Sequence, residues 1–166
     1  MAQSQDLAPT RLADQLERGF RGGAWHGPAL MELLSGVDGR LAQWRPGPAT
    51  HSIAELVGHL AYWLEDTERQ IVGANRPQYV PGSDWGPAKL DSDATWQAAC
   101  AALEEAHGRL WTAVHELEEV RLDEVRSGSD TTIRGLLLGI LQHNAYHAGQ
   151  IALLRKQAEA AVGRTP

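Results

Sequence analysis

The residues of this sequence that are best suited to chemistry stand out in one short stretch, QHNAYHAGQ, at residues 142–150. His143 and His147 are four residues apart and interrupt an otherwise apolar run with helical periodicity. On a helix, residues at this spacing have Cβ atoms about 5–6 Å apart, so their imidazoles can bind one metal ion. His59 lies on the apolar face of an earlier predicted helix. An inward histidine from one helix and an inward pair from another would form a three-histidine metal site.

Two interpretations of these histidines fit the spacing alone. A single histidine on an apolar face is commonly a core residue whose ring bonds to a carbonyl or a hydroxyl group. Three such histidines would each need a separate buried partner, whereas one shared cation satisfies all three. Neutral imidazole suits Zn, Ni, Cu or Fe, and three protein ligands typically leave one coordination position open. The helical His-x-x-x-His pair is a weak motif, so the spacing leaves both the metal site and the metal-free core open.

Four stretches with helical periodicity predict the elements that would position these histidines, and none shows sustained strand-like alternation. They cover roughly residues 8–40 (broken by Gly19, Gly22 and Gly23), 53–73, 92–120 and 132–160. The third stretch carries an alternating four-three apolar spacing, which is typical of a helix that faces a bundle. The pattern predicts an all-α fold, a four-helix bundle formed by a single domain over residues 1–166.

The limits of the second predicted helix are marked by specific residue types. Ser52 and Glu55 fit a capping box, in which a serine is followed three residues later by a glutamate. Gly73 predicts the end of the same helix. Residues 74–91 hold three prolines and two glycines and predict a long irregular loop between the second and third helices. Loops of this length in a compact domain are often lids or binding loops.

The composition indicates an ordinary globular protein, with 43 % hydrophobic and 22 % charged residues in 166. A net charge of −6 without a Lys/Arg cluster argues against nucleic acid as a partner. Cys100 is the single cysteine and suits a reducing compartment. The N-terminal residues lack the pattern of a signal peptide, and no apolar stretch approaches the ~20 residues that cross a bilayer. We therefore expect a cytoplasmic protein without a membrane partner.

Three further polar residues are candidates for contacts around the histidines. Gln150 follows His147 by three residues and is expected to orient a ligand imidazole or a bound water. Asp66 lies two helical turns after His59 on the same face, where it would act as a base or as a partner of a ligand. His107 lies on the apolar seam of the third helix. Each also has an ordinary interpretation: a helix-packing glutamine, a helix-end charge and a satisfied core histidine.

Several longer segments of the sequence resemble the DinB/YfiT-like superfamily. They are HSIAELVGHLAYW, LLGILQHNAYHAGQIALLRK and the lead-in WRPGPATHSI, together with GAWHGP at residues 23–28 and the Asp-Trp pair at 84–85. Members of that superfamily bind a divalent metal inside a four-helix bundle, through one histidine on the second helix and an H-x-x-x-H-x-G-Q pair on the fourth. The resemblance spans nearly the whole chain and implies that His59, His143 and His147 are the metal ligands.

The reaction class follows from the metal and from the resemblance, because other motifs are lacking. Asn144 and Ala145 follow His143 where H-E-x-x-H proteases have their glutamate, and the sequence has no Gly-rich phosphate loop and no plausible Ser-His-Asp set. An ion with one open position could hold a thiol as thiolate or lower the pKa of bound water. The resemblance implies a divalent ion (Zn, Ni or Fe) and, for some members, transferase or isomerase activity with bacillithiol, mycothiol or glutathione.

These observations lead to two expectations for function. The first is a metal-dependent thiol transferase or hydrolase, whose partners are a low-molecular-weight thiol and a small electrophilic substrate. The alternative is a non-enzymatic, stress-associated metal-binding protein in which the ion stabilises the bundle. The resemblance also implies a homodimer.

Overall fold

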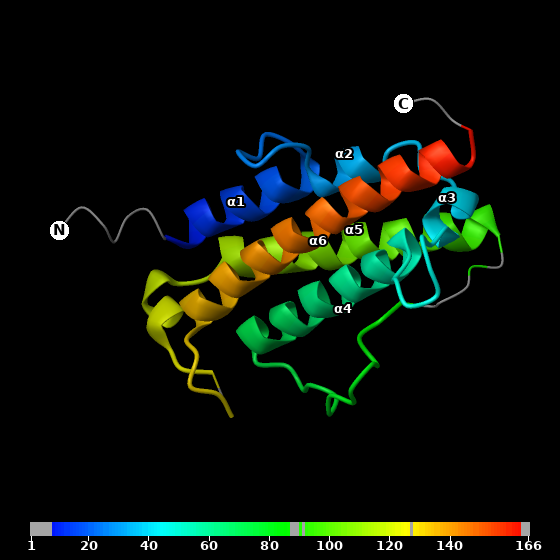
Figure 1. Ribbon diagram of the computed structural model, residues 1–166. Helices are drawn as coiled ribbons and strands as arrows, with labels where there is room; N and C mark the ends of the chain where they lie inside the picture. The colour runs from blue at the N-terminus through cyan, green and yellow to red at the C-terminus, as the bar shows by residue number, and fades with distance from the viewer. Residues whose placement is uncertain (1–7, 87–89, 91, 127, 164–166) are drawn as a thin grey trace.

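The computed structural model describes residues 8–86, 90, 92–126 and 128–163 (Figure 1). Regular structure in these residues is helical, apart from one isolated antiparallel bridge between Val125 and Thr132. The helices are α1 (Pro9–Arg21), α2 (Leu30–Leu34), α3 (Gly39–Gln43), α4 (Ile53–Val72), α5 (Asp93–His115), the 3₁₀-helix η2 (Glu119–Asp123) and α6 (Ile133–Ala161). The predicted all-α class is therefore confirmed for the described part of the chain.

The four long helices lie side by side along the length of the molecule (Figure 1). Helix α4 packs against both α5 and α6, and α1 packs against the same two helices. The short helices α2 and α3 lie near the C-terminal end of α6 and contact it. One hydrophobic core runs through all these contacts, with fully buried side chains from every long helix, among them Leu12, Phe20, Leu60, Leu110 and Leu137. No helix among the described residues is sufficiently long and apolar to cross a lipid bilayer.

Helix α4, which carries His59, begins and ends as the sequence predicts. The hydroxyl of Ser52 accepts a hydrogen bond from the Glu55 amide, and the Glu55 carboxylate accepts one from the Ser52 amide at 2.8 Å. This reciprocal capping box satisfies two amides that the first turn leaves without helical partners. At the other end Gly73 has a φ of 72°, a left-handed conformation that glycine adopts without steric cost. Both limits of this helix are therefore fixed by local chemistry.

Two of the predicted helical stretches are divided differently in the structure. The stretch expected over residues 8–40 forms three helices, α1 to α3. Positive φ angles at Gly22 and Gly23 follow the end of α1 at Arg21, and Gly36, with a φ of 75°, lies between α2 and α3. The stretch expected over 92–120 ends at His115 and is followed by η2. Leu117, the last residue of the predicted apolar pattern, is buried although it lies beyond α5, and Leu122 in η2 is buried as well. The apolar spacing therefore extends past the point where the helix ends.

The segment between α4 and α5 turns back along α4 (Figure 1). Of the predicted irregular residues 74–91, the structure describes 74–86 and 90, and these contain turns and bends without helix or strand. Residues 87–89 and 91 lie outside the described part.

Candidate metal centre

Three imidazole nitrogens converge where α4 packs against α6. Nε2 of His143 lies 3.1 Å from Nε2 of His59 and 3.1 Å from Nε2 of His147. One nitrogen from each residue falls within 4.8 Å of the others. His59 and His147 are each 6 % exposed, and His143 is half-buried. The three residues that the sequence predicts as ligands are therefore brought together.

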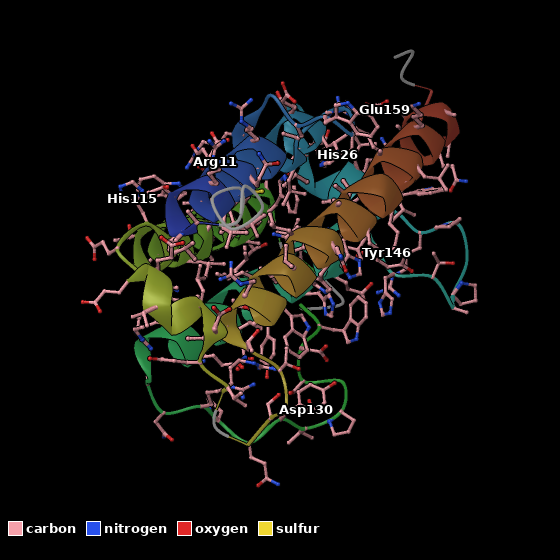
Figure 2. The ribbon with its side chains drawn as sticks, turned by 90° about the vertical axis from the view of Figure 1, so that its left-hand side faces the viewer. Arg11, His26, His115, Asp130, Tyr146 and Glu159 are labelled. Atoms are coloured by element: carbon pink, nitrogen blue, oxygen red, sulfur yellow. The ribbon has the colours of Figure 1, made fainter. Side chains whose placement is uncertain are left out.

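The positions of these histidines follow from the helices that carry them. His143 and His147 are one turn apart on α6, so both rings leave the same face of that helix. His59 leaves the buried face of α4. In Figure 2 the labelled Tyr146 marks the position of the cluster, because its ring lies against His147. His26 and His115 are labelled on other parts of the surface. Helix packing thus selects these three of the seven histidines.

A hydrogen bond fixes the orientation of the His59 ring. Its Nδ1 lies 3.1 Å from the backbone oxygen of Asp84 and 3.3 Å from Oδ2 of the same residue. Both oxygens are acceptors, so Nδ1 carries the proton and donates it. The remaining nitrogen, Nε2, then presents its lone pair to the cluster, which is the tautomer that a metal ligand requires.

A second hydrogen bond fixes the orientation of the His147 ring and the nitrogen that carries its proton. Its Nδ1 donates to Oε1 of Gln150 at 2.6 Å, and the Gln150 amide nitrogen donates to the hydroxyl of Tyr146 at 3.0 Å. Both ends of the Gln150 amide group are therefore held. With the proton on Nδ1, Nε2 of His147 is an acceptor that faces His143. Gln150 therefore contacts a candidate ligand directly.

The environment favours the uncharged form of all three rings. Burial, with the neighbouring rings of His147 and His59, lowers the pKa of His143 to about 4. Burial is also the main cause that lowers the pKa of His59 and of His147. Imidazole must be neutral to donate a lone pair, so the three rings have the protonation state of metal ligands at neutral pH.

The donor set fits a divalent cation. Nε2 of His59 and Nε2 of His147 both present lone pairs toward Nε2 of His143, and one proton on that atom can satisfy only one of them. A single cation accepts all three lone pairs. Among the described residues, no fourth His, Cys, Asp or Glu joins the group. Three nitrogen ligands with an open position are the arrangement typical of catalytic zinc sites.

Aromatic rings cover the His59 side of the cluster. The indole of Trp85 stacks on His59 with ring centroids 4.2 Å apart, and His51 stacks on the same indole at 3.5 Å. Trp63 donates its Nε1 proton to Oδ2 of Asp84 at 3.1 Å. Asp84 is only 6 % exposed, so its carboxylate is held by these contacts inside the protein. The Asp-Trp pair at 84–85, noted in the sequence only as part of a resemblance, therefore supports a candidate ligand directly.

The loop reaches His59 because two glycines allow backbone contact. Gly86 packs on Gly58 of α4, and a Cβ atom added to Gly58 would lie 2.3 Å from the Gly86 Cα. The Gly86 amide donates to the backbone oxygen of Glu55 at 3.4 Å. Any larger side chain at either position would push the loop away from α4. This contact is the packing reason why Asp84 reaches the ring of His59.

Two residues expected near the cluster have their contacts elsewhere. Asp66 is buried and accepts hydrogen bonds from Arg76 at 2.7 and 2.8 Å and from Gln70 at 2.7 Å. It therefore anchors the start of the loop after α4, and the hydrogen bonds of its carboxylate go to Arg76 and Gln70. His107 is buried against α1, where Nε2 lies 2.9 Å from Glu17 and the ring stacks on Phe20. These contacts are those of a core histidine, which is the ordinary interpretation of this residue.

The sequence was also compared with known proteins. The model of the DinB superfamily matches residues 24–151, a range that includes the three histidines and Gln150. No curated protein matches the sequence. Because the family match covers well over half of the 166 residues, the chain belongs to the DinB superfamily.

Proposed function

We propose that this protein binds one divalent metal ion through His59, His143 and His147 and uses it as a metal-dependent thiol transferase or hydrolase on a small electrophilic molecule. The four helices of the expected bundle would be α1, α4, α5 and α6, with the ion between α4 and α6. The observation that carries it is the convergence of three neutral Nε2 atoms without a fourth candidate ligand among the described residues. Zn, Ni and Fe all suit such a site.

The bound ion would supply Lewis acidity, which lowers the pKa of a thiol or a water at the open position. Asp84 and Gln150 would hold His59 and His147 in the tautomers that bind the ion. Trp85 would keep water away from the His59 side. In a transfer reaction the thiol sulfur forms a bond to the electrophilic carbon, the leaving group departs with its electron pair, and the thiol proton passes to solvent.

The competing function is a non-enzymatic metal-binding protein in which the ion stabilises the helices. A structural ion is usually enclosed by four protein ligands, whereas a catalytic ion keeps a position for substrate. Three histidines, one of them half-buried, favour the catalytic function. A low-molecular-weight thiol is the co-substrate that the family resemblance suggests.

Metal content and turnover together test this proposal. The purified protein is expected to hold about one equivalent of metal per chain, as three protein ligands suggest. It should convert an electrophile from a panel of epoxides, aryl halides and esters, with or without an added thiol. His147→Ala should lose both properties. Stoichiometric metal without any turnover would favour the non-enzymatic function, and absence of metal binding would refute both.

A further inference from the structure

A cleft of about 460 Å³ lies beside the metal centre, between α6 and the residues that precede and begin α4. Its walls are mainly apolar, formed by Pro46, Leu56, Trp85, Leu153 and Leu154. Leu153 is 59 % exposed and belongs to this concave surface. Exposed apolar side chains that gather in a groove often mark a binding site. A volume in this range is typical of pockets for small molecules.

The cleft and the metal centre share two side chains. Trp85 lines the cleft and stacks on His59 at 4.2 Å. Gln150 lines the cleft and accepts the Nδ1 proton of His147 at 2.6 Å. A molecule in the cleft would therefore touch the groups that orient two of the three candidate ligands. None of the three histidines is among the described lining residues, so the cleft adjoins the cluster through these two side chains.

The chemistry of the walls selects the charge of the ligand. None of the described lining residues is Asp, Glu, Lys or Arg. Its polar groups are the hydroxyl of Thr50, the imidazole of His51 and the amides of Gln150 and Gln157. Arg45, which donates to the backbone oxygen of Thr50 at 3.2 Å, is already paired with Glu55 at 2.7 Å. An ionised group placed in the cleft would therefore lose part of its hydration without a dedicated counter-charge in the lining, which is costly. A neutral group can use the amides and the hydroxyl as hydrogen-bond partners.

We propose that this cleft binds the neutral, largely apolar part of the substrate, and that Trp85 and Gln150 form the wall that places it against the metal centre. This inference rests on the proposed function and specifies its substrate class: an uncharged small molecule with an alkyl or aromatic body. The cleft takes the electrophile rather than a carboxylate-bearing thiol, because it offers such a thiol no described cationic side chain.

A series of matched probes tests the charge and the shape of the ligand. Hexanamide, hexanoate and hexylammonium each contain six carbon atoms and differ in charge at pH 7.5. Binding to the full-length protein, after incubation with Zn²⁺ and removal of the excess, is measured by NMR of ¹⁵N-labelled indoles, with the Trp85 resonance assigned from Trp85→Phe. Hexanamide should shift the Trp85 signal and bind at least tenfold more tightly than either ion. Each methylene added, from pentanamide to heptanamide, should strengthen binding about fourfold.

A matched pair of variants locates the binding. Leu153→Lys places a cation in the cleft and should weaken hexanamide at least tenfold while hexanoate becomes the preferred probe. Ala160→Lys adds the same charge to an exposed position of α6 outside the cleft and should leave all three affinities unchanged. Both positions are exposed on the helix, so both variants should fold, and far-UV circular dichroism verifies this.

Three results would overturn the inference: no shift of the Trp85 signal, equal affinity for the charged probes, or unchanged hexanamide binding in Leu153→Lys. Metal content, measured on the same samples, separates this inference from the proposed function. If hexanamide binds as expected and no metal is present, the cleft is confirmed as a binding site and the proposed function falls. If metal binds and hexanamide does not, only the substrate class is refuted.

Discussion

The amide oxygen of Gln150 lies 2.6 Å from Nδ1 of His147, one turn away on α6, while the amide nitrogen donates to the hydroxyl of Tyr146. The glutamine therefore connects a candidate metal ligand to a tyrosine that is 64 % exposed at the surface. Because a carbonyl oxygen can only accept, this contact sets which nitrogen of His147 carries the proton.

Loss of this contact is expected to weaken metal binding without removing a ligand. Gln150→Leu keeps the helix and all three histidines but leaves the His147 Nδ1 proton unpaired. Groups that orient ligands typically change metal affinity by about 10–100-fold, so a loss in this range is expected. Competition with a chromophoric chelator measures it. Gln150→Glu retains an acceptor and should restore most of the affinity; equal affinity in Gln150→Leu and the unchanged protein would contradict the assignment.

Removal of a proposed ligand should have a larger effect. His147→Ala leaves two imidazoles on the ion and should abolish stoichiometric metal binding, as determined by elemental analysis of the purified protein. His115→Ala is the matched control, since His115 is exposed on α5 and stacks on Trp111. It should retain the full metal content. Metal content that does not change in His147→Ala would rule out the three-histidine site.

From the contact between Gly58 of α4 and Gly86 of the loop we predict that a larger side chain at position 58 lowers the free energy of unfolding. In Gly58→Ala the new methyl group meets the Gly86 backbone, so the loop must move away. Overpacking of this kind typically costs about 1–3 kcal/mol, and it should also weaken metal binding because Asp84 moves with the loop. Urea unfolding and chelator competition measure the two effects.

Gly108→Ala on α5 is the control for that substitution. A Cβ atom at Gly108 meets no atom within 4 Å, apart from its own helix backbone. Alanine is favoured over glycine in a helix by roughly 0.5–1 kcal/mol, so this variant should be more stable than the original protein. Equal stability changes in the two variants would show that the Gly58–Gly86 contact is unimportant.

The buried His107 predicts a specific dependence of stability on pH. Burial lowers its pKa below 6.5, and the contact with Glu17 offsets this only in part. The unfolded chain then binds a proton more readily than the folded protein does. The stability that depends on neutral His107 is therefore complete above about pH 6.5 and is lost as the pH falls below that value.

His107→Phe should isolate this effect, because the new ring can still stack on Phe20. Free energies of unfolding are compared between pH 7.5 and pH 5 with EDTA present, so that the three clustered histidines His59, His143 and His147 contribute equally to both proteins. The variant should gain stability relative to the original protein as the pH falls. If the difference in free energy of unfolding between the two proteins does not change with pH, His107 has the same pKa in the folded and the unfolded state.

The sequence was sufficient for the features that depend on local spacing. The capping box at Ser52 and the glycine stop at Gly73 are decided within one turn of helix, and both were predicted. His143 and His147 could be paired because i and i+4 positions share a helix face in any helix. His59 could be added because its position on an apolar face indicated that it points inward.

The remaining contacts depend on distance along helices and on packing between segments. Asp66 shares a face with His59, but seven residues separate them by about 10.5 Å along the axis, too far for a contact between their side chains. His107 faces α1, which apolar periodicity cannot distinguish from α6. Asp84 reaches His59 from a segment 25 residues later along the chain, and only the packing of Gly86 on Gly58 shows why.

The attachment of the loop at both ends has a thermodynamic consequence. Near its start Arg76 is bound to Asp66, and near its end Gly86 rests on Gly58 while Asp84 holds His59. Ordering a backbone residue costs roughly 1–2 kcal/mol in conformational entropy. In this protein the contacts of Arg76, Gly86 and Asp84 offset part of that cost within the chain itself. An imidazole that such contacts hold in place leaves less ordering to be offset by whatever binds to it.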